Sequence, residues 1–267
     1  MSILRPLLAL GAMGAAPAAA QSGPPAPSAL TVFAAASLSD AFEELGALFR
    51  RRHPGITVRF NFAGSQQLAA QLEHGASADV FASADRRWMA RVQQLGLAAG
   101  EPAVFAHNRL LVILPAANPA RIERLEDLAR PELKLVLAAD AVPAGRYTRE
   151  MLRNLSRSGF GSDYGRRVLA NVVSEEENVK GVAAKVQLGE ADAGVVYRSD
   201  VTPGIAARFR VIDIPTAANV VASYPIVALA ASRAPDAARA FVELVRGPEG
   251  RATLERHGLT PPTPVAP

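Results

Sequence analysis

Three consecutive units, each an apolar run followed by a helical pattern of apolar residues, constrain the fold of this chain more than any other feature. The predicted strands of these units cover residues 31–36, 56–63 and 79–84. In the first unit the apolar residues that follow recur at i, i+4, i+7 and i+11, and they are Leu38, Phe42, Leu45 and Phe49. This spacing lies on one face of a helix. Because strands that alternate with helices favour a parallel sheet covered by helices, the sequence predicts an α/β fold.

The same alternation restarts at Asn108, which indicates a second lobe. Its predicted strands cover 110–114, 133–138, 193–197 and 209–214, and its predicted helices cover 125–128, 144–155 and 178–188. A strand over 224–231 is expected to return to the first lobe, where helices over 236–246 and 248–257 complete the fold. The final residues, PPTPVAP at 261–267, are typical of a disordered tail.

The N-terminus predicts export from the cytoplasm. Arg5 is followed by the apolar run PLLALGAMGAAPAAA, and Ala18 and Ala20 fit a small-x-small cleavage rule. The run is too short to span a bilayer, so we expect residues 1–20 to be a removed signal peptide and 21–29 to be a flexible leader. With no later stretch long and apolar enough to cross a membrane, the mature protein is expected in the periplasm.

Composition excludes several classes of site. The chain has no cysteine, which excludes disulfides, zinc–thiolate sites and cysteine nucleophiles. The net charge of +4 is too small to indicate a nucleic-acid partner. Its one tight basic run, Arg50–Arg52, closes a predicted helix, where cations suit the helix dipole. The four histidines are scattered without ligand spacing, at His53, His74, His107 and His257.

Small or polar residues open a helix at four predicted loops, two in each lobe. These loops hold Ser37, Gly64–Ser65, residues 142–145 and residues 177–179. Ligands of open α/β sheets bind outside the carboxyl ends of strands. Helix N-termini there present free N–H groups and the positive end of the dipole, both of which favour anions. Facing lobes would therefore place positive helix ends across a cleft.

Several of these residues also fit purely structural roles. Ser37 and Ser65 fit plain helix N-caps. Asp40 with Glu43, three residues later, fits a capping box at the first helix. Trp88 fits a packing residue, and we assign it no ligand role.

The second lobe leaves similar alternatives open. Ala144 follows Pro143, and proline is common in the first turn of a helix. Val179 lies on an apolar stripe, so only its backbone N–H is a candidate donor. Tyr197 ends an apolar strand and fits a core tyrosine whose hydroxyl is satisfied elsewhere.

Five motifs at these loops resemble the periplasmic molybdate-binding proteins (ModA) of ABC transporters. They are FAAASLSDAF at 33–42, FAGSQQLAAQLEHGASADVFASAD at 62–85, VPAGRYTREML at 142–152, ENVKGVAAKVQLGEADAGVVYRSDV at 177–201 and YPIVAL at 224–229. They stand in the family's order and spacing, behind a signal peptide. The likeness covers nearly the whole mature chain, from about Leu30 to Gly258.

The resemblance implies a two-lobed type II periplasmic binding protein fold. Each lobe is then a mixed, mainly parallel sheet flanked by helices, with the ligand cleft between the lobes. The chain crosses twice between them, which implies a first lobe of residues 30–106 plus 223–260 and a second lobe of residues 107–222.

The resemblance also implies a ligand and the residues that hold it. The ligand is molybdate or tungstate, with no cofactor and no metal site beyond molybdenum in its oxyanion. Ser37 and Ser65 would each give a hydroxyl and a backbone N–H, Ala144 and Val179 a backbone N–H, and Tyr197 its phenolic hydroxyl.

The chain departs from common family forms at two positions. Gly64 stands where serine is frequent, which removes a possible extra hydroxyl. Asn178 stands where aspartate is often found, which removes a negative charge beside an anion.

The implied function is an extracytoplasmic solute-binding protein that delivers molybdate to the permease and ATPase of an ABC importer, as a monomer and not as an enzyme. Three alternatives stay open. The same module would serve sulfate, thiosulfate or another oxyanion. A secreted hydrolase would use Ser37 or Ser65 as nucleophile, but the sequence has no GxSxG elbow and no histidine motif that serves them. A ligand-sensing domain would need an attached effector segment, and the sequence contains none.

Overall fold

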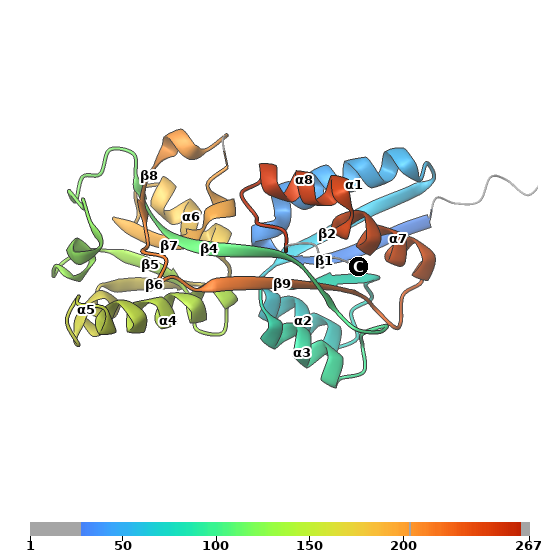
Figure 1. Ribbon diagram of the computed structural model, residues 1–267, viewed down its shortest axis with the longest axis horizontal. Coiled ribbons are helices and arrows are strands. Elements are labelled where there is room, and N and C mark those ends of the chain that lie inside the picture. The colour runs from blue at the N-terminus through green and yellow to red at the C-terminus, as the bar shows by residue number, and fades with distance from the viewer. Residues whose placement is uncertain (1–27, 203, 263–267) are drawn as a thin grey trace, which may run out of the picture.

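The computed structural model describes residues 28–202 and 204–262 (Figure 1). The predicted signal peptide, the predicted leader up to residue 27 and residues 263–267 of the predicted tail lie outside the described residues. Residues 28 and 29, at the end of the predicted leader, belong to the first strand.

The described chain alternates strands and helices for most of its length. The strands are β1 (Ser28–Ala35), β2 (Ile56–Ala63), β3 (Val80–Ala82), β4 (Ala103–Pro115), β5 (Leu135–Ala138), β6 (Val172–Glu176), β7 (Ala193–Tyr197), β8 (Phe209–Asp213) and β9 (Val221–Ala228). The α-helices are α1 (Ser39–Arg52), α2 (Ser65–Glu73), α3 (Arg86–Gln94), α4 (Pro143–Arg157), α5 (Tyr164–Ala170), α6 (Val179–Gln187), α7 (Pro235–Arg246) and α8 (Pro248–Arg256). The 3-10 turns are η1 (Ala36–Leu38), η2 (Leu125–Ala129), η3 (Arg198–Asp200) and η4 (Ala206–Arg208).

The strands form a mixed sheet in the order β2-β1-β3-β9-β4-β7-β5-β6, with β8 paired to β4. Within the first lobe β1 pairs parallel with β2 and β3, and within the second lobe β5 pairs parallel with β6 and β7. The long strands β4 and β9 pair antiparallel and run from one lobe to the other (Figure 1). The predicted α/β class, with mixed sheets flanked by helices, is confirmed.

Helices cover both faces of each lobe. Figure 1 shows α1, α7 and α8 on one face of the first-lobe strands and α2 and α3 on the other, with α6 opposite α4 and α5 in the second lobe. The lobe boundaries predicted at 106/107 and 222/223 fall inside β4 and β9. The exact boundaries stay a prediction. Among the described helices, none is long and apolar enough to cross a bilayer.

The apolar residues that recur with helical spacing in the first unit lie in the core of the first lobe. Leu38, Phe42, Leu45 and Phe49 are all fully buried. Phe42 and Phe49 meet Phe241 of α7 edge to face, with ring centroids 5.9 and 5.5 Å apart. Burying each of these side chains stabilises the fold by about 1.5–3 kcal/mol, so α1 is held mainly by its apolar face.

The start of α1 differs from the prediction. The chain enters α1 through η1, and the N-cap residue Leu38 has helical backbone angles and no side-chain cap. A capping box needs an extended N-cap residue, so the predicted Asp40–Glu43 box is wrong. Asp40 instead lies 3.4 Å from Lys180 of α6, in the second lobe.

Candidate functional site

A small cavity lies where the two lobes meet. Its lining comes from the strand ends and helix starts of both lobes, and it includes all five residues that the sequence predicted: Ser37, Ser65, Ala144, Val179 and Tyr197. The other lining residues are Ala35, Ala36, Ala63, Gly64, Ala84, Val142, Pro143 and Asn178. None of these side chains is charged, so any ligand here meets only neutral groups.

Helix starts supply the backbone donors of this cavity. Ser65 and Val179 are the first residues of α2 and α6, and Ala144 is the second residue of α4. The first N–H groups of a helix have no partner inside it, and the helix dipole adds partial positive charge at the same end. The cavity therefore gathers N–H groups from helix starts of both lobes, which have no partner inside their own helices.

Glycine at position 145 allows α4 to begin directly against the sheet. A Cβ atom there would lie 2.3 Å from the carbonyl oxygen of Ala138, at the end of β5. This close approach places the neighbouring N–H of Ala144 beside the cavity.

The two serine hydroxyls are buried and already hold one protein partner each. Ser65 Oγ accepts a hydrogen bond from the Ala84 N–H at 3.0 Å, so its own proton is available to the cavity. Ser37 Oγ lies 3.0 Å from the hydroxyl of Tyr224. Neither bond involves a histidine, and no histidine lines the cavity. This geometry gives no support to a serine hydrolase.

Tyr197 brings a buried hydroxyl without a described partner to the cavity. Its side chain is 1% exposed, and its hydroxyl has no hydrogen-bond partner among the described residues. Burial raises the pKa of Tyr197 well above its usual value, so the hydroxyl stays neutral and keeps its proton. A buried hydroxyl without a hydrogen-bond partner lowers the stability of the folded protein by about 1–3 kcal/mol. The alternative reading, in which another protein group satisfies the Tyr197 hydroxyl, has no support among the described residues.

The two departures from the family pattern have structural reasons that sequence reasoning missed. A Cβ atom on Gly64 would lie 2.5 Å from the Glu177 carbonyl oxygen, which belongs to the second lobe. Glycine therefore lets the lobes approach closely. Asn178 is the N-cap of α6, and its side-chain oxygen accepts from the Gly181 N–H at 3.1 Å.

Polar contacts join the lobes around the cavity. Gln66 donates to the Glu177 carbonyl at 2.7 Å, and the Trp88 indole N–H donates to the Ala141 carbonyl at 3.0 Å. Trp88 thus does more than pack.

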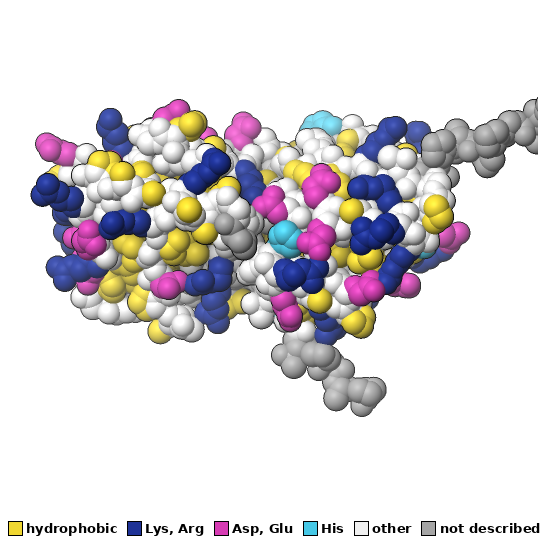
Figure 2. All heavy atoms as spheres, turned by 90° about the horizontal axis from the view of Figure 1, so that it is seen from above, with side chains coloured by type: hydrophobic (Ala, Val, Ile, Leu, Met, Phe, Trp, Pro, Cys, Tyr) yellow, Lys and Arg dark blue, Asp and Glu magenta, His cyan; other side chains and the backbone are white. Residues whose placement is uncertain are grey.

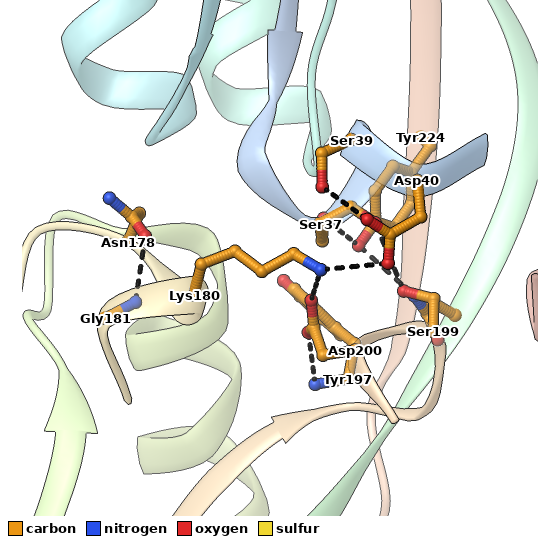
Figure 3. A network of polar contacts seen from close by, with 11 residues as sticks. Ser37, Ser39, Asp40, Asn178, Lys180, Gly181, Tyr197, Ser199, Asp200 and Tyr224 are labelled. Atoms are coloured by element: carbon orange, nitrogen blue, oxygen red, sulfur yellow. Dashed lines mark hydrogen bonds and ion pairs between the residues drawn. The ribbon is translucent and has the colours of Figure 1, made fainter. Parts of the chain in front are cut away.

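Two ion pairs between the lobes, and a third within the second lobe, extend this ring of contacts. Arg146 of α4 lies 3.0 Å from the buried carboxylate of Asp85. Figure 3 shows Lys180 reaching between Asp40 and Asp200, at 3.4 and 3.7 Å. No sequence pattern predicted these contacts, because the partners are far apart in the chain. Arg146 and Asp85 are separated by 61 residues, and Lys180 and Asp40 by 140.

The fold and the cavity define a solute-binding protein of two lobes. Residues 30–260 match the family described as bacterial extracellular solute-binding protein, and the chain belongs to this family. Within it, the chain is 40% identical over 247 residues to the molybdate-binding protein ModA of Mycobacterium tuberculosis H37Rv, which covers 92% of this chain and 90% of that relative. The chain is therefore a member of the ModA family, as its motifs predicted.

Two solved structures share the fold. The substrate-binding domain of a putative molybdenum ABC transporter from Clostridium difficile is 27% identical, with a TM-score of 0.64 over 87% of this chain and 98% of that one. The sulfate-binding protein SubI from Mycobacterium tuberculosis H37Rv has a TM-score of 0.78 over 88% of this chain and 87% of that one. At 16% identity SubI supports the fold alone.

Proposed function

We propose that this protein captures molybdate, and tungstate, in the cavity between its lobes. One observation carries the proposal: neutral donors from both lobes line a single cavity. Ser37 and Ser65 would each contribute a hydroxyl and an N–H, Ala144 and Val179 an N–H, and Tyr197 its hydroxyl. The relatives named for molybdate or molybdenum support this ligand.

Neutral donors are sufficient to hold a doubly charged anion. Hydrogen bonds to a charged group contribute about 1.5–3 kcal/mol each. The proposed positions offer two hydroxyl and two N–H donors from the serines, two further N–H groups and one phenol. Five to seven such bonds outweigh a closure cost of several kcal/mol, and helix dipoles add favourable potential.

The donor set also predicts specificity. Phosphate keeps a proton at neutral pH, and that proton needs a hydrogen-bond acceptor. The residues that line the cavity include no carboxylate that could accept it. Phosphate should therefore be rejected more strongly than sulfate. The alternative ligand is another tetrahedral oxyanion such as sulfate or thiosulfate, which would meet the same neutral donors. Cavity size would have to separate sulfate from the larger molybdate and tungstate.

We further propose that the mature protein works in the periplasm, after removal of residues 1–20, and delivers its ligand to the permease and ATPase of an ABC importer. The family description as extracellular and the relative described as part of an ABC transporter support this placement. We expect a monomer without cofactor. On the face in Figure 2, Lys and Arg side chains are interspersed with Asp and Glu, which supports the expectation of no nucleic-acid partner.

Isothermal titration of the mature protein against an oxyanion panel tests the proposal. Molybdate and tungstate should each bind at one site and compete with each other, whereas phosphate should give no binding heat. Displacement of tungstate by sulfate at comparable concentration would favour the alternative ligand. An absence of binding for every oxyanion would defeat both versions.

A further inference from the structure

A buried chain of polar groups leads from the strand that crosses between the lobes to one serine of the cavity. Asn108 of β4 lies 3.4 Å through its Nδ2 from the hydroxyl of Tyr224 on β9, and that hydroxyl lies 3.0 Å from Ser37 Oγ. Asn108 and Tyr224 are 2% and 0% exposed. Figure 3 shows Tyr224 and Ser37 in contact, with Ser199 beside them.

The hydrogen bonds of Asn108 fix the orientation of its amide. Its side-chain oxygen accepts from the Arg109 N–H at 3.0 Å. Its NH₂ group therefore faces the hydroxyls of Ser199, at 2.8 Å, and Tyr224. An amide NH₂ group donates and does not accept.

The direction of the next bond follows from this assignment. The described partners of the Tyr224 hydroxyl are the Asn108 NH₂ group and Ser37 Oγ. Since the NH₂ group cannot accept, the phenolic proton must go to Ser37 Oγ or stay unpaired, at a cost of about 1–3 kcal/mol. Burial raises the pKa of Tyr224, so that proton is retained. Ser37 Oγ thus accepts from Tyr224, and its own proton is left for the cavity.

We propose that Asn108 and Tyr224 are positioning residues, a donor relay that holds the Ser37 hydroxyl as a donor toward the cavity and so selects fully deprotonated oxyanions over protonated ones. The inference rests on the proposed function, because it needs an oxyanion in this cavity. The Ser65 hydroxyl likewise accepts a hydrogen bond, from the Ala84 N–H, so its own proton is also left for the cavity. The donor to Ser65 is a backbone group, whereas the donors toward Ser37 are side chains. A mutation can therefore reverse the hydrogen-bond direction at Ser37 but not at Ser65.

Asn108→Asp reverses the relay with almost no change in shape. A carboxylate oxygen in place of the NH₂ group accepts the Tyr224 proton, Tyr224 then accepts from Ser37, and a lone pair of Ser37 faces the cavity. Molybdate, which offers no proton, should bind about tenfold to a hundredfold more weakly. Hydrogen phosphate, which does offer one, should lose much less, so the ratio of the phosphate Kd to the molybdate Kd falls at least about tenfold.

The measurement is titration of both anions at about pH 8, where phosphate is mainly the hydrogen phosphate dianion. Both ligands then carry two negative charges, so repulsion by the new carboxylate cancels in the ratio of the two Kd values. Phosphate Kd values too weak for direct titration are measured by competition against tungstate. Thermal unfolding of each variant checks that it folds.

The matched variants are Tyr224→Phe, Asn108→Asp combined with Tyr224→Phe, and Tyr164→Phe. Tyr164 is a buried tyrosine whose hydroxyl donates to the Leu125 carbonyl, away from the cavity. The relay predicts that Asn108→Asp changes the ratio only when the Tyr224 hydroxyl is present, and that Tyr164→Phe leaves the ratio at the wild-type value.

Two results would overturn the relay: equal weakening of both anions by Asn108→Asp, or an unchanged effect of Asn108→Asp in the Tyr224→Phe background. Failure of the wild-type protein to bind molybdate would instead overturn the proposed function.

Discussion

Replacing Tyr197 with phenylalanine should have opposite effects on stability and on ligand binding. The hydroxyl is buried and has no partner among the described residues. Its removal relieves a desolvation cost of about 1–3 kcal/mol, so the free energy of unfolding of the ligand-free protein should stay equal or rise. The same change removes one donor to the oxyanion and should weaken molybdate binding by about tenfold to a hundredfold, corresponding to about 1.5–3 kcal/mol.

Thermal unfolding with and without molybdate measures both effects in one assay. A ligand at about a hundred times its Kd stabilises the folded state by about 2.7 kcal/mol. At the molybdate concentration that gives the wild type this gain, Tyr197→Phe should keep about half of it or less. Titration calorimetry gives the affinity directly.

Tyr164→Phe is the matched control. Its hydroxyl donates to the Leu125 carbonyl, so this variant should lose about 1 kcal/mol of stability and keep its molybdate affinity. An unchanged molybdate affinity in Tyr197→Phe, or a loss of stability as large as in the control, would refute the reasoning about the unpaired hydroxyl.

Three further changes test other parts of the site. Ser37→Ala should weaken molybdate binding about tenfold to a hundredfold, and an unchanged Kd in calorimetry would remove Ser37 from the site. Gly64→Ala should weaken molybdate binding by obstructing lobe closure, because the new Cβ would lie 2.5 Å from the Glu177 carbonyl oxygen. If solution scattering shows that the variant becomes as compact with molybdate as the wild type, this expectation is contradicted. Burial raises the pKa of Asp200 to about 6, against the opposing effect of Lys180, from a usual value of 3.8. The folded protein therefore holds this proton more tightly than the unfolded chain, so Asp200 lowers stability as the pH rises through that window. The free energy of unfolding of the wild type relative to Asp200→Asn should accordingly fall between about pH 4 and pH 6 by chemical denaturation, and a constant difference would argue against it.

Local patterns predicted the elements that carry strong periodicity. The strands over 56–63 and 193–197 were predicted with the bounds that the structure gives them. The pattern at strand ends also identified the loops whose residues meet in the cavity. That Ser37 and the other predicted residues bind the ligand stays a prediction.

The elements that sequence reasoning missed have weak local signals. Helix α5 has seven residues and follows a glycine-rich turn, so its apolar pattern is too short to read. Strand β6, with the sequence VVSEE, lies at the edge of the sheet and buries little. Its polar residues resemble a loop more than a strand.

The geometry of the cavity depends on contacts between the lobes that no local sequence pattern records. The relay from Asn108 through Tyr224 to Ser37 joins three elements through tertiary packing. The close approach of Gly64 to Glu177 likewise appears only when both lobes are in place. Family resemblance gave the residue positions, whereas the directions of their hydrogen bonds required the structure.

A crystal structure of the protein soaked or grown with molybdate, using the anomalous signal of molybdenum, tests the central claim most directly. The account predicts one molybdenum peak in the cavity, with the hydroxyls of Ser37, Ser65 and Tyr197 and the N–H groups of Ala144 and Val179 within about 2.7–3.2 Å of its oxygens. A peak elsewhere, or an anion in this cavity held by a lysine or arginine side chain, would contradict it.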